Sequence, residues 1–219
     1  MERILIFKRE SKEIVSICSS DIKMKRLVNI VGDYTLTLRN DYFLSLVRSI
    51  IGQQLSIKTA STIWDRVIQI SSDVNPDNIL EIDDFQFRLA GVSNPKIKYI
   101  KELSKAVLTK EIDFSEFNNL ENDMVINTLM RVKGIGRWTA EMFLIFSLGR
   151  LDVLATGDIG LQRAMRWLYG LDSDISSEYI QELGRKWSPY RTIASLYLWE
   201  IINRGYIAKD VNKILNNPL

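Results

Sequence analysis

The amino-acid sequence predicts a mainly α-helical fold. Along most of its 219 residues, apolar side chains recur every three or four positions, which is the spacing of one buried helix face. Only Arg3–Phe7 and Tyr34–Leu38 look like strands, and they could pair with each other or be irregular. A hydrophobic content of 46% is enough for one well-buried domain or for two helical lobes around a cleft.

The helical segments follow one another along the chain. Ser11–Ile30 fits one or two short helices, and a helix from Asp41 ends at Gly52. The helix over Lys58–Ile70 should bury Ala60, Ile63, Trp64, Val67 and Ile68. Further helices are predicted after Asn75-Pro76, after Pro95 and after Asp158. One more should run from a cap at Asp123 through Val132, and another from Arg137 or Trp138 to Leu148, where Gly149 ends it. The last should have Ser188 as its cap and Pro189 as its first helical residue.

Residue usage excludes several kinds of chemistry. The sequence has no histidine, so Ser-His and Cys-His nucleophiles and histidine-ligated metals are excluded. Its single cysteine, Cys18, cannot form an intramolecular disulfide and cannot supply a four-cysteine zinc site or an iron–sulfur cluster. Acid–base chemistry must therefore come from Asp, Glu, Lys, Tyr or Cys side chains.

The charges are segregated along the chain although the net charge is only +2. Basic residues outnumber acidic ones over Arg131–Arg166 and over Lys96–Lys110, and acidic residues gather at Asp73–Asp84 and Asp172–Glu182. This distribution could steer a polyanion to one face, or it could be ordinary solvated helix surface. The N-terminal apolar stretch is too short for a signal peptide and no segment is long enough to span a membrane, so we expect a soluble, cytoplasmic protein, associated with the nucleoid if prokaryotic.

A glycine-rich turn, Gly134-Ile135-Gly136, separates two predicted helices. Such a turn leaves backbone N–H groups pointing outward at the start of the second helix, where they can bind a phosphate. Lys133 and Arg137 flank the turn and would add charged contacts. These groups cannot read a base, so the turn predicts sequence-tolerant binding of a nucleic-acid backbone. Gly-x-Gly alone is equally compatible with a plain turn between two helices.

The longer string Val132-Lys133-Gly134-Ile135-Gly136-Arg137-Trp138-Thr139-Ala140 resembles the helix-hairpin-helix signature of DNA base-excision glycosylases. It is most similar to the alkyladenine branch, whose type is bacterial 3-methyladenine DNA glycosylase II. Four other segments resemble that branch in the same order. They are Phe43–Ser56 with its Gly-Gln-Gln, Gly91-Val92-Ser93 followed by Lys96, Thr156–Leu161, and Trp187–Arg191 followed by Leu198-Trp199. The resemblance therefore extends from Asp41 to Arg204.

This resemblance implies a helix-hairpin-helix glycosylase fold with two helical lobes around a DNA-binding cleft. We expect residues 1–40 to be a short segment packed on the C-terminal lobe. Residues 41–149 would form the lobe that ends in the hairpin, and residues 150–219 the lobe that carries the catalytic aspartate. The large N-terminal β-domain of the bacterial prototype has no counterpart in the first 40 residues.

The resemblance places the catalytic carboxylate at Asp158. Breaking a glycosidic bond builds positive charge on the sugar, which a fixed carboxylate can stabilise. By position alone Asp158 is also a good helix N-cap, and one residue can fill both roles. Asp152 is the competing carboxylate, but it lies too early in the loop to match the motif. Bifunctional relatives carry a lysine where this sequence has Trp138, which indicates glycosylase activity without strand cleavage.

The resemblance also assigns groups that would handle a base after it leaves the helix. Trp138 and Trp199 fall at pocket positions, and Met142 replaces a tyrosine of the prototype; the tryptophans could instead be core residues. Trp64 and Trp167 are expected in the core. In the turn at 52–56, Gln54 matches the wedge that fills the vacated space, Leu55 is its neighbour, and Gln53 is expected to tie loops together. Contacts with the DNA backbone are expected from Lys133, Gly134, Ile135, Gly136, Arg137 and Thr139.

The predicted function is a monofunctional DNA N-glycosylase that excises alkylated purines and leaves an abasic site. The alternatives are a glycosylase of the same fold for uracil, hypoxanthine or oxidised guanine, and a non-enzymatic helix-hairpin-helix DNA-binding module. Double-stranded DNA with damaged bases is the expected partner of a monomer. No organic cofactor is implied; relatives hold Na⁺ or K⁺ at hairpin carbonyls, which correspond to the backbones of Met130, Val132 and Ile135.

Overall fold

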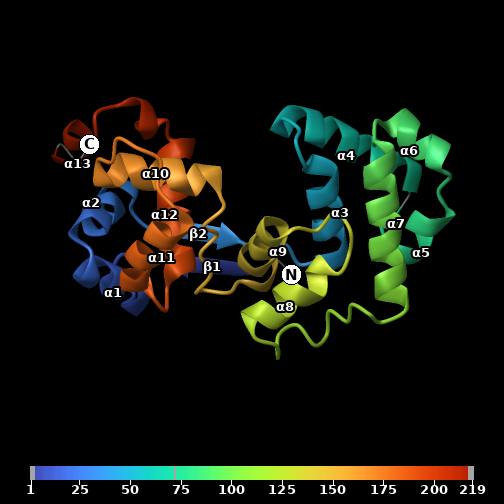
Figure 1. The fold of residues 1–219 in the computed structure, drawn as a ribbon, viewed down its shortest axis with the longest axis horizontal. Helices are drawn as coiled ribbons and strands as arrows, with labels where there is room; N and C mark the ends of the chain where they lie inside the picture. Colours follow the sequence, from blue (N-terminus) through green and yellow to red (C-terminus); the bar gives the residue numbers. More distant parts are fainter. Residues whose placement is uncertain (1–2, 72, 217–219) are drawn as a thin grey trace. The chain divides into compact units, whose positions relative to one another are not determined.

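The computed structural model describes residues 3–71 and 73–216. The chain forms two compact units, shown in Figure 1. Unit 1 combines the two ends of the chain, Met1–Leu38 and Gly149–Leu219, and unit 2 is the continuous segment Arg39–Leu148. The mainly helical prediction is confirmed, because the described part of the chain is helical apart from two short strands and the connecting turns.

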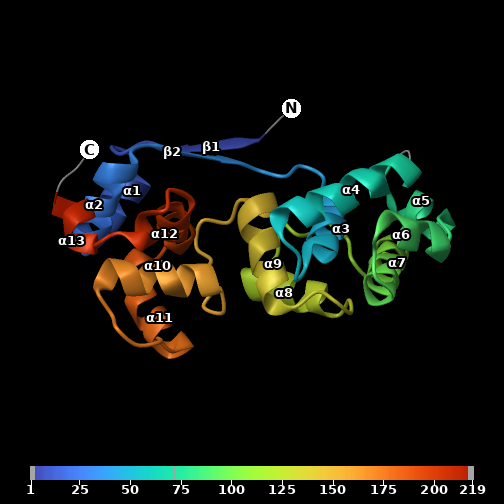
Figure 2. The same cartoon turned by 90° about the horizontal axis from the view of Figure 1, so that it is seen from above.

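Unit 2 is built from helices around α3 (Tyr42–Gly52). Asp41 caps this helix by accepting a hydrogen bond from the backbone N–H of Leu44. Figures 1 and 2 show α3 among α4, α7 and α9, all of which it contacts. The remaining helices of the unit are α4 (Ile57–Ser71), α5 (Pro76–Glu81), α6 (Asp84–Ala90), α7 (Asn94–Leu108), α8 (Asn122–Met130), α9 (Arg137–Phe143) and the π-helical turn η1 (Leu144–Leu148).

Unit 1 is organised around α12 (Arg191–Asn203), whose residues from Thr192 to Leu198 are all buried. The strands β1 (Ile4–Phe7) and β2 (Tyr34–Thr37) pair antiparallel, so the two strand-like segments do meet. The other elements are α1 (Lys12–Ser20), α2 (Ile22–Val31), α10 (Ile159–Tyr169), α11 (Ser177–Gly184), η2 (Arg185–Trp187), η3 (Tyr206–Ala208) and α13 (Val211–Asn216).

A buried aspartate ties the N-terminal helices to the C-terminal part of unit 1. Asp21 is 7% exposed and its Oδ1 caps α2 by accepting from the N–H groups of Lys23 and Met24. Its Oδ2 accepts from the hydroxyl of Tyr169 and, at 3.2 Å, from the indole Nε1 of Trp187. Four donors from three parts of the chain therefore meet at one carboxylate.

Three predicted helix boundaries are wrong. Helix α8 ends at Met130 rather than Val132, because the next N–H groups bond three residues back, Val132 to Leu129, and start the hairpin turn. Its first residue is Asn122, so Asp123 lies inside the helix and is not its cap. Helix α12 begins at Arg191, since the Ser188 hydroxyl donates to Asp152 instead of capping a helix.

Three predicted core positions also differ from the structure. Ala60, in the first turn of α4, is only partly buried. Ile68 is 43% exposed, because it lies on the outer side of α4 whereas Ile63, Trp64 and Val67 are buried as expected. Trp167 is half-buried, and its indole N–H donates to the backbone carbonyl of Lys209 at 2.7 Å. Among the described helices, none is long and apolar enough to cross a membrane.

Candidate active site

Asp158 stands at the N-terminus of α10 and is fixed by two donors. Its Oδ1 accepts from the backbone N–H of Leu161 at 2.6 Å and from the indole Nε1 of Trp199 at 2.9 Å. The first bond makes Asp158 the N-cap that its position predicted, where the helix dipole favours a negative charge. The second bond comes from α12 and holds the carboxylate in one orientation.

Gly160 lets Asp158 and Trp199 come together. A Cβ at this position would lie 3.1 Å from Asp158 Oδ1, 3.3 Å from the Ile202 Cδ1 and 3.6 Å from the Trp199 Cδ1. The approaches to Asp158 and Ile202 are tighter than ordinary packing, so a larger residue would press on the carboxylate, whereas the distance to Trp199 is an ordinary contact. The Asp-x-Gly pattern thus has a structural reason within unit 1.

Trp199→Phe is expected to lower about tenfold the rate of the base excision that the resemblance implies, since it removes one hydrogen bond to a charged carboxylate while keeping an aromatic ring in place. Single-turnover excision gives the rate, and DNA affinity should stay unchanged because the indole acts through Asp158. Gly160→Ala should reproduce the loss. If both variants keep the wild-type rate with an intact fold, Trp199 does not position the carboxylate.

Asp152, the competing carboxylate, has a different set of partners. It accepts from the Arg191 Nε at 2.7 Å, from the Arg191 backbone N–H at 3.1 Å and from the Ser188 hydroxyl at 3.1 Å. Burial alone would raise the pKa of Asp152, but the hydrogen bonds from Arg191 and Ser188 outweigh it and hold the pKa below its ordinary value. Asp152 therefore fastens the loop before α10 to the start of α12.

The hairpin between α8 and α9 adopts a tight turn that needs glycine at its first position. Gly134 has φ +86°, and a Cβ there would lie 2.2 Å from the ring of Tyr99. Gly136 has φ −88° and is the N-cap of α9, with open space around it. The turn is closed by the Ile135 N–H, which donates to the Val132 carbonyl at 3.1 Å.

Other segments of unit 2 fasten the hairpin from behind. The Gln53 side chain donates to the Gly134 carbonyl at 2.7 Å, which confirms the prediction that Gln53 ties loops together. The ammonium group of Lys96 donates to the carbonyls of Ile51 and Gln53, at 2.9 and 2.7 Å. Lys96, which was predicted only as part of a basic stretch and of one motif that resembles the glycosylases, thus has a structural role at the end of α3.

The two hairpin glycines give a matched pair of variants. Gly134→Ala is expected to destabilise the protein by more than about 2 kcal/mol, because the added carbon strikes Tyr99 and the backbone is left-handed. Gly136→Ala should cost about 1 kcal/mol or less. It should nevertheless weaken DNA binding about tenfold if a phosphate approaches this backbone. Thermal melting and fluorescence anisotropy measure the two effects. Wild-type affinity of Gly136→Ala would exclude that approach.

The charged and polar residues of the hairpin are placed unequally. Lys133 is exposed. Arg137 is half-exposed and lies 3.2 Å from Glu141 and 3.5 Å from Asp123. The Thr139 side chain is 5% exposed, so any contact with a DNA strand would have to come from its backbone N–H in the first turn of α9.

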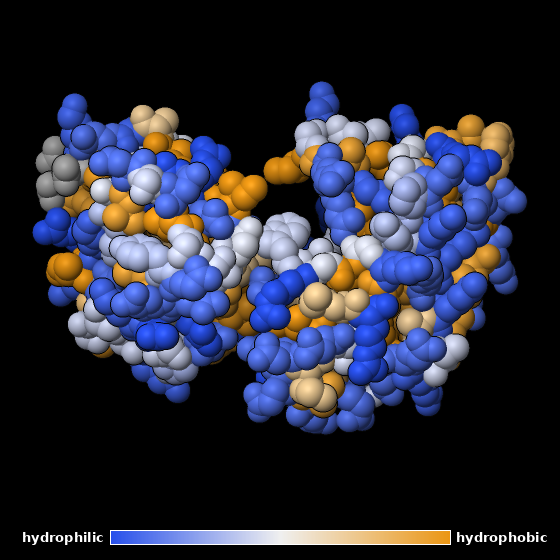
Figure 3. Space-filling model, viewed as in Figure 1, coloured by the Kyte–Doolittle hydropathy of each residue, from blue (hydrophilic) through white to orange (hydrophobic). Residues whose placement is uncertain are grey.

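The predicted pocket and wedge residues of unit 2 line one pocket of about 600 Å³. Trp138 is 48% exposed, and Met142 is buried. Gln54 holds a left-handed backbone, φ +58°, in the turn between α3 and α4, and Leu55 next to it is partly exposed. Ile57, which the sequence analysis did not single out, is 92% exposed, and Figure 3 shows hydrophobic surface over the start of α4. Trp199 belongs to unit 1 and contacts Asp158.

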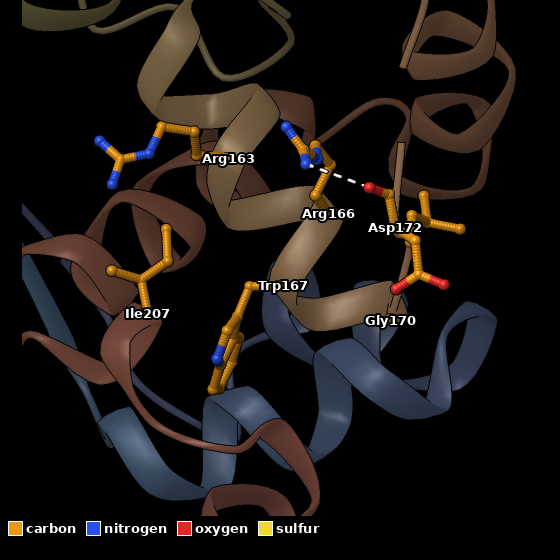
Figure 4. Close-up of a pocket in the computed structure, with 7 residues that line it drawn as sticks. Arg163, Arg166, Trp167, Gly170, Asp172 and Ile207 are labelled. Atoms are coloured by element: carbon orange, nitrogen blue, oxygen red, sulfur yellow. Dashed lines mark hydrogen bonds between the residues drawn. The ribbon is translucent and has the colours of Figure 1, made fainter. Parts of the chain in front are cut away.

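A second pocket lies in unit 1 around Trp167, and Figure 4 shows it. Arg163, Arg166 and Ile207 also line it. Arg166 is engaged with acidic residues: its guanidinium donates to the Asp174 carboxylate at 2.5 Å and lies 3.5 Å from the Asp172 carbonyl. The half-buried tryptophan that was expected in the core therefore borders a pocket.

The backbone oxygens proposed for a monovalent cation lie around the hairpin. The Val132 carbonyl already accepts from the Ile135 N–H, which leaves one lone pair for an ion. Oxygen donors of this kind suit a hard cation. Among the described residues, no group of three or more His, Cys, Asp or Glu side chains could hold a metal ion.

A glycine-rich hairpin at the start of α9, followed along the chain by a helix whose N-cap is an aspartate, is the pattern of a helix-hairpin-helix protein of the base-excision type. The profile of the HhH-GPD superfamily of base excision DNA repair proteins matches residues 47–189, which is more than half of the chain. The chain belongs to this superfamily.

Relatives with known names are similar over nearly the whole chain. DNA-3-methyladenine glycosylase 1 of Schizosaccharomyces pombe is 33% identical and the match covers 92% of this chain and 91% of the relative. Alkylbase DNA glycosidase-like protein mag2 of the same yeast is 34% identical, with 89% and 93% covered.

Solved structures confirm the fold. A DNA-3-methyladenine glycosidase from Bacillus halodurans is similar with a TM-score of 0.87 and 39% identity, covering 97% of this chain and 100% of that one. The S. pombe glycosylase Mag1, solved in complex with abasic DNA, has a TM-score of 0.79 and 32% identity, covering 88% and 97%. An 8-oxoguanine glycosylase/lyase from Clostridium acetobutylicum, with a TM-score of 0.71 and 18% identity, shares the fold.

Proposed function

We propose that this protein is a monofunctional DNA-3-methyladenine glycosylase, which removes alkylated purines from double-stranded DNA in base excision repair. The observation that carries the proposal is the carboxylate of Asp158, held by Leu161 and Trp199 at the N-terminus of α10. The proposal is also supported by the similarity, over nine-tenths of the chain, to a DNA-3-methyladenine glycosylase of S. pombe. A DNA-binding module without activity would need no carboxylate fixed in this way.

Asp158 would act on the sugar. As the bond from C1′ of the deoxyribose to the base nitrogen breaks, its electron pair leaves with the base and positive charge builds on the sugar ring. A carboxylate with a fixed orientation stabilises that charge without reorganising, which is commonly worth about 3 kcal/mol of barrier. Water then adds to C1′ and loses a proton, so that the products are the free base and an abasic site.

Unit 2 would hold the DNA. The N–H groups of Gly134 and Gly136, with Lys133 beside them, would bind phosphates of the backbone without reading sequence, whereas the Ile135 N–H is already engaged by the Val132 carbonyl. The half-exposed ring of Trp138 would stack on the base, with the largely buried Met142 in the same pocket. Alkylated purines such as 3-methyladenine and 7-methylguanine carry positive charge, and an indole face attracts a cation by about 0.5–2 kcal/mol. Gln54 or Leu55 would occupy the space that the base leaves.

Absence of strand cleavage tests the monofunctional part of this proposal. A bifunctional enzyme uses a lysine amine that forms an imine with the sugar, and the position of that lysine is occupied by Trp138. A duplex with one natural abasic site should therefore stay intact through a long incubation. It should also give no covalent protein–DNA adduct with borohydride. More nicking than in the same duplex incubated without protein, or a covalent adduct, would show lyase chemistry and contradict the assignment.

A further inference from the structure

Two arginines line the pocket of unit 2 and have no part in the function proposed so far. The pocket is bounded by the turn after α3, the start of α4, and α9 with η1. Arg48, on α3, and Arg39, at the start of the unit, lie on its wall together with Trp138. Arg48 belongs to the motif that ends in Gly-Gln-Gln, four residues before Gly52.

Each guanidinium group is held over an aromatic ring. The Arg48 guanidinium carbon lies 5.8 Å from the centre of the Trp64 ring, and that of Arg39 lies 5.6 Å from the centre of the Phe146 ring. The backbone of Arg39 is fixed too, because its N–H donates to the Phe146 carbonyl at 2.8 Å. Stacking uses the face of a guanidinium and leaves its N–H edge available to an acceptor.

The charge of this wall is positive. Among the described residues that line the pocket there is no Asp or Glu. The pKa of Arg39 is lowered, first because the surrounding protein shields its guanidinium from water and then because the charge of Arg48 repels it. Two like charges that share one pocket are stabilised by an anion that enters it.

We propose that Arg39 and Arg48 form a second phosphate site, which binds the DNA strand carrying the extrahelical nucleotide. A phosphate oxygen suits the fork of N–H donors that each guanidinium presents. The alkylated purine of the proposed function, on which this step rests, would contact Trp138, and its positive charge makes it a poor partner for the two guanidinium groups themselves. The site differs from the hairpin, which offers backbone N–H groups.

Binding to abasic DNA tests the site, because such DNA keeps every phosphate and lacks the base. Arg48→Gln and Arg39→Gln are each expected to weaken the affinity for a duplex with a stable abasic analogue about tenfold. Each should reduce the slope of log K against log salt by about 1. Arg88→Gln is the matched control, since Arg88 also stacks on a ring in unit 2, at 5.7 Å from Phe85, and does not line the pocket. It should keep the wild-type affinity and slope.

Arg48→Lys keeps the positive charge but loses the planar guanidinium, so it distinguishes the effect of charge from that of hydrogen-bond geometry. It also replaces Arg48→Gln as the test if that variant unfolds when it loses the stacking on Trp64. It should keep the salt slope and still bind less tightly, because an ammonium lacks the fork. Unchanged affinity for abasic DNA in the folded arginine variants would overturn the proposal. A change confined to the preference among damaged bases would also overturn it, by showing contact with the base. These titrations measure binding and need no excision, so their outcome is independent of whether the protein is a glycosylase.

Discussion

Asp158→Asn is expected to lower the release of alkylated bases by about a hundredfold to a thousandfold, because the neutral amide no longer stabilises positive charge on the sugar. The amide oxygen can still accept from the Leu161 N–H and from the Trp199 indole, so the start of α10 should stay in place. Affinity for an abasic duplex should remain within about twofold of wild type, because the hairpin contacts are untouched. Single-turnover release and anisotropy titration give the two numbers.

Asp152→Asn is the matched control for that experiment. It removes a carboxylate six residues earlier, whose hydrogen bonds go to Arg191 and Ser188. It should lower the melting temperature and leave the rate of base release near that of wild type. If the Asp152 variant is the inactive one and the Asp158 variant releases bases normally, the carboxylate has been assigned to the wrong residue.

Asp21→Ala is expected to destabilise the protein by about 3 kcal/mol, the largest effect we predict on folding. The change removes the cap of α2 and leaves the buried Trp187 N–H and the partly buried Tyr169 hydroxyl without their acceptor. For a chain of this size the loss corresponds to a fall in melting temperature of about 6–12 °C. Thermal unfolding followed by circular dichroism measures it.

Asp41→Ala separates the cap from the buried network. Asp41 caps α3 through the Leu44 N–H, and its side chain has no comparable buried cluster in the structure. Its loss should therefore cost about 1 kcal/mol, the ordinary value of an N-cap. Equal effects of the Asp21 and Asp41 variants would show that the contacts with Tyr169 and Trp187 add nothing to stability.

Periodicity was a good guide to the elements of this protein. The spacing of apolar residues in α3, α4 and α12 sets the face that each helix buries, and the structure has helices at those places. The N-cap role of Asp158 was also visible, because Gly-Asp before an apolar periodic segment is a local signal. Such local signals depend only on residues a few positions apart, so they can be recognised in a single sequence.

Contacts between distant segments were not predictable in the same way. Nothing near Trp199 in the sequence indicates that its indole donates to a carboxylate 41 residues away. The same holds for Lys96, whose ammonium group binds carbonyls at the end of α3. The predicted helix boundaries were wrong where tertiary contacts compete with local propensity. At Ser188, for example, the hydroxyl donates a hydrogen bond to Asp152 instead of capping a helix. Whether Arg39 and Arg48 share a pocket depends on the path of the chain and not on their spacing.

The identity of the released base tests the central claim most directly. The purified protein is incubated with a methylated duplex, and the small molecules set free are identified by chromatography, with Asp158→Asn alongside. The proposed function predicts that the wild-type protein releases 3-methyladenine or 7-methylguanine and leaves abasic sites in an unbroken strand, and that the variant releases almost none. A wild-type protein that binds this DNA and releases no alkylated base would contradict the account.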